Sequence, residues 1–202
     1  MNASKADKII KILEENTETT PKLNHKNPLE LLVATILSAQ STDAQINKIT
    51  PKLFKSFKTA QDFKDSDLHS QSAGTLDHRS RSHIRTQASQ REAARKFANC
   101  ELRVLEQAIH SSGFYHNKAK NIKAACTRIV EDFDGKVPDN MEDLTSLPGI
   151  GRKTANIILT YGFDKPVGIA VDTHVSRVSQ RLGFTKNKDP NKIEQDLLKL
   201  IP

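Results

Sequence analysis

The sequence is poor in cysteine: its 202 residues include only Cys100 and Cys126. Two thiols cannot make a four-thiolate metal or cluster site, and a disulfide is not expected in a reducing compartment. We therefore predict no metal site in this chain. Both cysteines are expected to be ordinary core or surface residues.

The chain also lacks a long apolar run. No run approaches the roughly 18–20 residues that span a bilayer, and residues 1–8 lack the apolar core of a signal peptide. An intracellular location without a membrane partner is therefore expected. Hydrophobic residues make up 36% and charged residues 27% of the chain, which is ordinary for a globular protein of one domain or two small lobes.

Positively charged side chains outnumber negatively charged ones. The formal net charge is +7 and the pI is about 9.4. Lysine and arginine that neutralise phosphates release counterions, so the excess is compatible with a polyanionic partner. Basicity alone is weak support for such a partner.

Apolar residues recur at helical spacing almost throughout, and no alternating strand pattern is present, so the fold class is all-α. Capping signals predict where the helices begin. The expected helices begin at or after Ser4, Asn27-Pro28, Thr42 or Asp43, residue 102, Asn117, Asn140, Arg152, Thr173 and Asp189-Pro190. Pro51 is expected to kink or split the third helix.

Residues 64–96 break this pattern. They are rich in serine, glutamine and charge, and their only large apolar residues are Leu68, Leu76 and Ile84. Such a segment buries too little apolar surface to offset its ordering entropy. We predict a disordered or loosely helical insertion. It is either a sequence artefact or a basic loop that contacts a polyanion.

The most informative string is Leu-Pro-Gly-Ile-Gly-Arg-Lys-Thr-Ala at 147–155. Its glycines allow a tight turn and a close backbone approach to a ligand. The helix that follows aims free N–H groups and its dipole at that point, which makes an anion site. The spacing is not that of a P-loop.

Lys153 lies in the first turn of that helix. The helix dipole and the neighbouring Arg152 both disfavour its ammonium form, and a neutral amine is a nucleophile. The simpler interpretation is a solvated lysine that binds phosphate. Downstream, residues 171–174 read Val-Asp-Thr-His. The helix that contains Lys153 leads the chain away from the turn, and an extended segment of comparable length then brings it back. Asp172 is therefore expected to lie near Lys153.

Asp172 has two interpretations. It precedes an expected helix, where an N-cap belongs, and a carboxylate beside Lys153 can stabilise a developing cation or accept a proton. Both roles are compatible. His174 is either a packed or capping residue or a residue that contacts a ligand.

Together, the 147–155 string and Val-Asp-Thr-His resemble the endonuclease III family of helix-hairpin-helix DNA glycosylases. The resemblance implies base-excision repair of double-stranded DNA by a monomer located in the cytoplasm or nucleoid. It implies a glycosylase that removes oxidised pyrimidines and also has abasic-site lyase activity. In such an enzyme Lys153 is the Schiff-base lysine and Asp172 is the catalytic aspartate. It assigns DNA contacts to Pro148, Gly149, Ile150, Gly151, Arg152, Thr154 and His174.

Two further strings carry the resemblance. Leu37 to Asp43 implies that Gln40 enters the space left by a flipped nucleotide, although a loop cap is the alternative. Ser112 to Ala119 implies a second intercalating loop, with Phe114 as an apolar wedge rather than a core aromatic. Lys118 and Lys120 are expected to be backbone-binding or surface charges.

The family's architecture is a six-helix lobe and a second lobe formed by the termini. It predicts residues 1–19 in the second lobe, 20–140 in the six-helix lobe with the 64–96 insertion, 141–160 as the helix-hairpin-helix, and 161–202 as a return segment and partial second lobe. The family's [4Fe–4S] cluster requires four cysteines that this chain lacks, so the second lobe is expected to be incomplete or the chain truncated. The competing hypothesis is a non-catalytic DNA-binding module or an inactive fragment.

Overall fold

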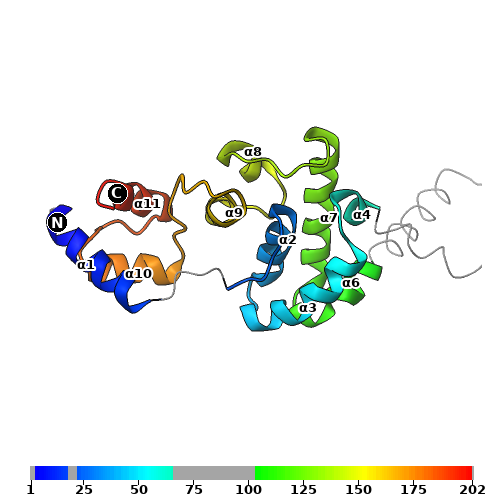
Figure 1. Ribbon diagram of the computed structural model, residues 1–202, viewed down its shortest axis with the longest axis horizontal. Coiled ribbons are helices and arrows are strands. Elements are labelled where there is room, and N and C mark those ends of the chain that lie inside the picture. Colours follow the sequence, from blue (N-terminus) through cyan, green and yellow to red (C-terminus); the bar gives the residue numbers. More distant parts are fainter. Residues whose placement is uncertain (1–2, 18–21, 66–102, 202) are drawn as a thin grey trace, which may run out of the picture. The chain divides into compact units, whose positions relative to one another are not determined.

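The computed structural model describes residues 3–17, 22–65 and 103–201, and over these ranges it contains helices and no strand (Figure 1). The prediction of an all-α fold is confirmed. No helix in these ranges is both long and apolar enough to cross a membrane. The helices are α1 (Ala3–Asn16), α2 (Pro28–Ser38), α3 (Asp43–Ser56), α4 (Ala60–Lys64), α6 (Arg103–Ile109), the 3₁₀ helix η2 (His110–Ser112), α7 (Tyr115–Asp132), α8 (Met141–Ser146), α9 (Arg152–Phe163), α10 (Thr173–Arg181) and α11 (Pro190–Leu198).

The described residues form two compact units. The terminal unit comprises the residues up to Leu32, Pro138–Ser146 and those from Ile150 onward, and the central unit comprises those of Val33–Val137 and Leu147–Gly149. The terminal unit therefore contains α8 and α9 together with the helices near both ends of the chain. The predicted segmentation into lobes stays a prediction.

The core of the terminal unit joins helices from both ends of the sequence. Ala6, Val171, Phe184, Ile193 and Leu197 are buried against one another. Two aspartates begin the last two helices as predicted, because Asp172 accepts from the N–H of Val175 and Asp189 accepts from that of Lys192. On α1, however, Ile12 is 60% exposed, so the described core covers only part of its apolar surface.

The central unit is built around α7, the long green helix in Figure 1, which packs against α4 and α6. Helix α4 was not predicted, although its signal is in the sequence. The Thr59 hydroxyl accepts from the N–H of Asp62, and the Asp62 carboxylate accepts from the N–H of Thr59, which is a capping box. The box places Phe63 in the core, stacked on Phe57 at 5.0 Å between ring centroids.

Several helix boundaries differ from the predictions. Helix α1 begins at Ala3, before Ser4. Helix α3 runs unbroken through Pro51, so of the two predicted effects of this proline the split is wrong, and the kink stays a prediction. Helix α7 begins at Tyr115 instead of Asn117, because Phe114 already turns the chain in the left-handed conformation.

The predicted insertion at 64–96 begins at the last residue of α4, Lys64, which is helical. Residues 66–96 lie outside the described residues, as do Cys100 and Leu102.

Candidate active site

The turn between α8 and α9 takes its shape from one glycine. Asn140 begins α8 as predicted by accepting from the N–H of Asp143, and Leu147 after the helix is buried. Gly149 has a φ of +80°, and a Cβ there would lie 3.0 Å from Cβ of Asn121. Both facts require glycine at this position.

Gly151 has a different role from the one expected. Its φ is −92°, and a Cβ there would meet nothing within 4 Å, so neither strain nor crowding demands glycine. It is the N-cap of α9 and, as a glycine, it offers no side chain to cap the first-turn N–H groups. Those donors are therefore available to an anion. Ile150, between the two glycines, is 5% exposed and is therefore buried.

Lys153 and Asp172 lie together, as the sequence predicts. Lys153 Nζ is 3.5 Å from Asp172 Oδ2, and the side chains are 49% and 40% exposed. Lys153 comes from the first turn of α9 and Asp172 from the residue before α10. The pair is therefore ion-paired yet open to a ligand.

The environment of Asp172 favours its ionised form. Partial burial acts to raise the pKa of this carboxyl, but the N–H of Val175, the charge and hydrogen bond of Lys153 and the N–H of His174 outweigh it, so the pKa is lowered. Oδ1 accepts from the N–H of Val175 at 2.8 Å. The capping role is therefore present, and Oδ2 faces Lys153 at the same time.

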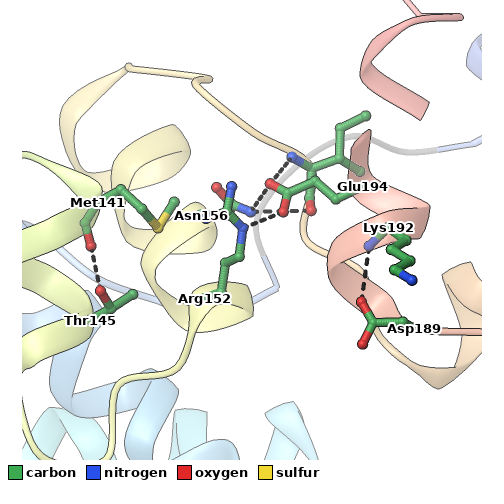
Figure 2. A network of polar contacts seen from close by, with 8 residues as sticks. Met141, Thr145, Arg152, Asn156, Asp189, Lys192 and Glu194 are labelled. Carbon is green, nitrogen blue, oxygen red and sulfur yellow. Dashed lines mark hydrogen bonds and ion pairs between the residues drawn. The ribbon is translucent and has the colours of Figure 1, made fainter. Parts of the chain in front are cut away.

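A buried carboxylate organises the start of α9 (Figure 2). The Glu194 side chain on α11 is 3% exposed and pairs through Oε2 with Nε of Arg152. Its Oε1 accepts from Asn156 Nδ2 at 2.8 Å, one turn further along α9. The guanidinium of Arg152 is thus directed at Glu194 while its side chain remains 48% exposed.

The same carboxylate holds the segment that leads to Asp172. Glu194 Oε1 accepts from the N–H of Ile169 at 3.3 Å, and Asn156 Nδ2 donates to the carbonyl of Ile169 at 3.1 Å. A Cβ on the neighbouring Gly168 would lie 2.4 Å from both Asn156 Oδ1 and Glu194 Oε1. Glu194 and Asn156 therefore link the helix of Lys153 to the approach to Asp172. Neither residue was predicted to belong to the site, although Glu194 is buried on α11 together with Ile193 and Leu197.

Other predicted site residues are distributed over both units. In the central unit, Gln40 is exposed and Phe114 is 68% exposed, so the alternative of a core aromatic is wrong for Phe114. In the terminal unit, His174 is exposed, with Nδ1 3.5 Å from a guanidinium nitrogen of Arg177. Pro148 and Thr154 are partly buried.

Lys118 departs from its prediction as a surface or backbone-binding charge. It is 5% exposed, and its ammonium donates to three acceptors within the central unit. The signal for burial was available, because Lys118 shares a helical face with Ile122, Ala125 and Ile129. Lys120 is exposed, as expected.

Cys126, the cysteine within the described residues, is not suited to bind the [4Fe–4S] cluster that the family resemblance implies. The chain has two cysteines, and Cys126 is fully buried inside α7. Burial raises the pKa of its thiol to about 12, which opposes the thiolate that iron requires. Within the described ranges no three His, Cys, Asp or Glu side chains gather into a metal-binding group.

Comparisons with known proteins agree with this geometry. Residues 33–202 match the model of the HhH-GPD superfamily of base excision DNA repair proteins. Endonuclease III of Synechocystis sp. is 45% identical over 183 residues, which is 91% of this chain and 68% of that protein.

Two solved structures share the fold with a TM-score of 0.72 and 37% identity, over 98% of this chain and 75% of theirs. One is a non-covalent endonuclease III–DNA complex, and the other is a trapped endonuclease III–DNA covalent intermediate. These similarities agree with the turn at Gly149 and with the pairing of Lys153 and Asp172. The chain therefore belongs to the HhH-GPD superfamily of base excision DNA repair proteins, and it is a DNA glycosylase.

Proposed function

We propose that this glycosylase removes oxidised pyrimidines from double-stranded DNA and then cleaves the strand as an abasic-site lyase, acting as a monomer. The observation that carries the proposal is the 3.5 Å separation of Lys153 Nζ and Asp172 Oδ2. A primary amine beside a carboxylate, open to solvent, suits an amine nucleophile whose proton needs an acceptor.

In the proposed reaction Lys153 loses a proton to Asp172 or to water, and its amine attacks C1′ of the damaged nucleotide. The bond from Nζ to C1′ forms, and the bond from C1′ to the base breaks, so the base leaves with the electron pair and takes up a proton. Opening of the sugar ring gives a Schiff base. Loss of a 2′ proton and of the 3′ phosphate cleaves the strand, and water then releases Lys153.

The remaining features support a DNA partner. The uncapped N–H groups at the start of α9 suit a phosphate, which the main chain can bind whatever the base sequence. The net charge of +7 favours the same polyanion. Among the related structures, one holds endonuclease III with DNA and another traps it covalently on DNA.

Borohydride trapping tests the lyase directly, because it reduces a Schiff base to a stable adduct. The full chain is incubated with a duplex that carries one abasic site, alongside Lys153→Ala and the control Lys192→Ala. Lys192 is an exposed lysine on α11 of the same unit, so its loss tests for a general effect of removing a positive charge.

We expect a covalent adduct with the unaltered chain and with Lys192→Ala, and none with Lys153→Ala. An adduct that persists in Lys153→Ala would assign the nucleophile to another residue. A folded chain that binds the duplex in a salt-dependent manner but forms no adduct would refute the lyase and favour a binding module. Release of thymine glycol from a second duplex tests base removal separately.

A further inference from the structure

Lys118 is a buried cation in the central unit with three hydrogen bonds. Its Nζ donates to the carbonyl oxygen of Leu37 at 2.7 Å, to Ser41 Oγ at 2.9 Å and to the carbonyl oxygen of Ser112 at 2.7 Å. An ammonium has three protons, so this set satisfies it fully. Burial lowers the pKa of Lys118.

The three acceptors lie at two connections that are far apart in the sequence. Leu37 is in the last turn of α2 and Ser41 is in the loop between α2 and α3, whereas Ser112 ends η2, shortly before the loop that leads to α7. Ser41 Oγ also donates to the carbonyl of Ser112, and Gln45 Nε2 donates to the carbonyl of Ser111 at 3.3 Å. The two loops are thus joined by a compact polar cluster with Lys118 at its centre.

Each loop also carries a residue in a strained conformation. Gln40 has a φ of 54° and Phe114 a φ of 48°, which side-chain-bearing residues rarely adopt. Both are exposed. Such strain persists where the surroundings fix the backbone on both sides, and the bonds of Lys118 lie within three residues of each strained position.

We propose that Lys118 is a positioning residue that holds the Gln40 and Phe114 loops in one rigid arrangement, so that both side chains enter the DNA helix together. This inference rests on the proposed function and deepens it, because it concerns how a nucleotide is extruded. Extrusion costs unstacking energy, which two inserted side chains offset only while their spacing is maintained. An apolar side chain at position 118 would leave the Leu37 carbonyl without the Lys118 donor. It would also remove one of the two hydrogen-bond donors to the Ser112 carbonyl.

The test uses Lys118→Met in the full chain, with Lys120→Met as the matched control. Both variants lose one positive charge from α7, but Lys120 is exposed. The first probe is a duplex with an uncleavable tetrahydrofuran abasic analogue opposite 2-aminopurine, whose fluorescence at saturating protein reports unstacking without any chemistry. The second is borohydride trapping at a natural abasic site, and thermal unfolding of each variant is measured alongside.

We expect the fluorescence rise at saturation to fall at least about fivefold in Lys118→Met, as for loss of hydrogen bonds to a charged group. The rate of trapping should fall with it, because Lys153 reaches C1′ only in an extruded nucleotide. Lys120→Met should match the unaltered chain in both. A purely structural role would lower the unfolding temperature while the folded variant keeps its fluorescence rise and its trapping rate, and that result would overturn the proposal. So would an unchanged fluorescence rise in a folded Lys118→Met.

If Lys118→Met does not fold, Ser41→Ala decides the question, because it removes one acceptor of Lys118 and one donor to Ser112 without burying a new group. A fluorescence loss of about twofold or more then supports the proposal, and no loss overturns it. Failure of the proposed function is a separate result: the unaltered chain would form no borohydride adduct, whatever its fluorescence response.

Discussion

The two carboxylate oxygens of Asp172 have different partners: Oδ1 accepts from the N–H of Val175 at 2.8 Å, and Oδ2 lies 3.5 Å from Lys153 Nζ. The hydrogen bond that begins α10 therefore also fixes the orientation of the oxygen beside the amine. A helix cap and a candidate catalytic carboxylate are the same side chain, and substitutions can separate the two roles.

Asp172→Asn should keep the cap and lose the charge. Asparagine caps helices about as well as aspartate, so the free energy of unfolding should fall by less than in Asp172→Ala, while the trapping rate should fall by roughly 10²-fold or more. Asp172→Ala should lose both, with about 1 kcal/mol of stability. Urea unfolding and timed borohydride trapping measure the two effects. A fully active Asp172→Asn would leave this carboxylate with the cap alone.

Stability should depend on pH through the same residue. An unfolded aspartate titrates near about pH 3.9, and the pKa of Asp172 in the folded protein is lower. Its ionisation therefore contributes stability that is complete above the unfolded pKa and is lost as pH falls through the folded one. Relative to Asp172→Asn, the unaltered chain should keep a constant difference in unfolding free energy from roughly pH 5 to 8 and lose stability below that. A relative gain on acidification would contradict this.

Arg152→Ala should destabilise the terminal unit. It leaves the Glu194 carboxylate, 3% exposed, without its cation, at a cost of about 2–3 kcal/mol. Adding Glu194→Gln removes the stranded charge and should restore at least half of the loss. Urea unfolding of the two single variants and the double variant gives the coupling. Additive losses would show that Arg152 and Glu194 act independently.

Gly168→Ala and Gly162→Ala should have opposite effects. A Cβ at Gly168 would lie 2.4 Å from two buried oxygens, and relieving that contact should cost about 1–3 kcal/mol. At Gly162, inside α9, the nearest atom would be 3.4 Å away, so helix propensity should give a gain of about 0.5–1 kcal/mol. Thermal unfolding compares them. Equal stability of the two variants would refute the crowding at Gly168.

The sequence by itself determined the features that depend on neighbours a few positions apart. Asn140, Asp172 and Asp189 begin helices because each side chain accepts from an N–H three residues ahead, and such a bond is visible in the order of residues. The return of Asp172 towards Lys153 followed from the lengths of one helix and one connection. Thr59 and Asp62 show that a local signal can also be overlooked.

Only the tertiary structure decided which polar side chains are buried and what they bind. Lys118 meets Leu37 across 81 positions, and Glu194 meets Arg152 across 42. A charged residue on an apolar helix face is stable there only if distant acceptors or donors converge on it, and helical periodicity carries no record of those partners. Burial of a charge is a property of the assembled core, so it became visible only once the helices were packed.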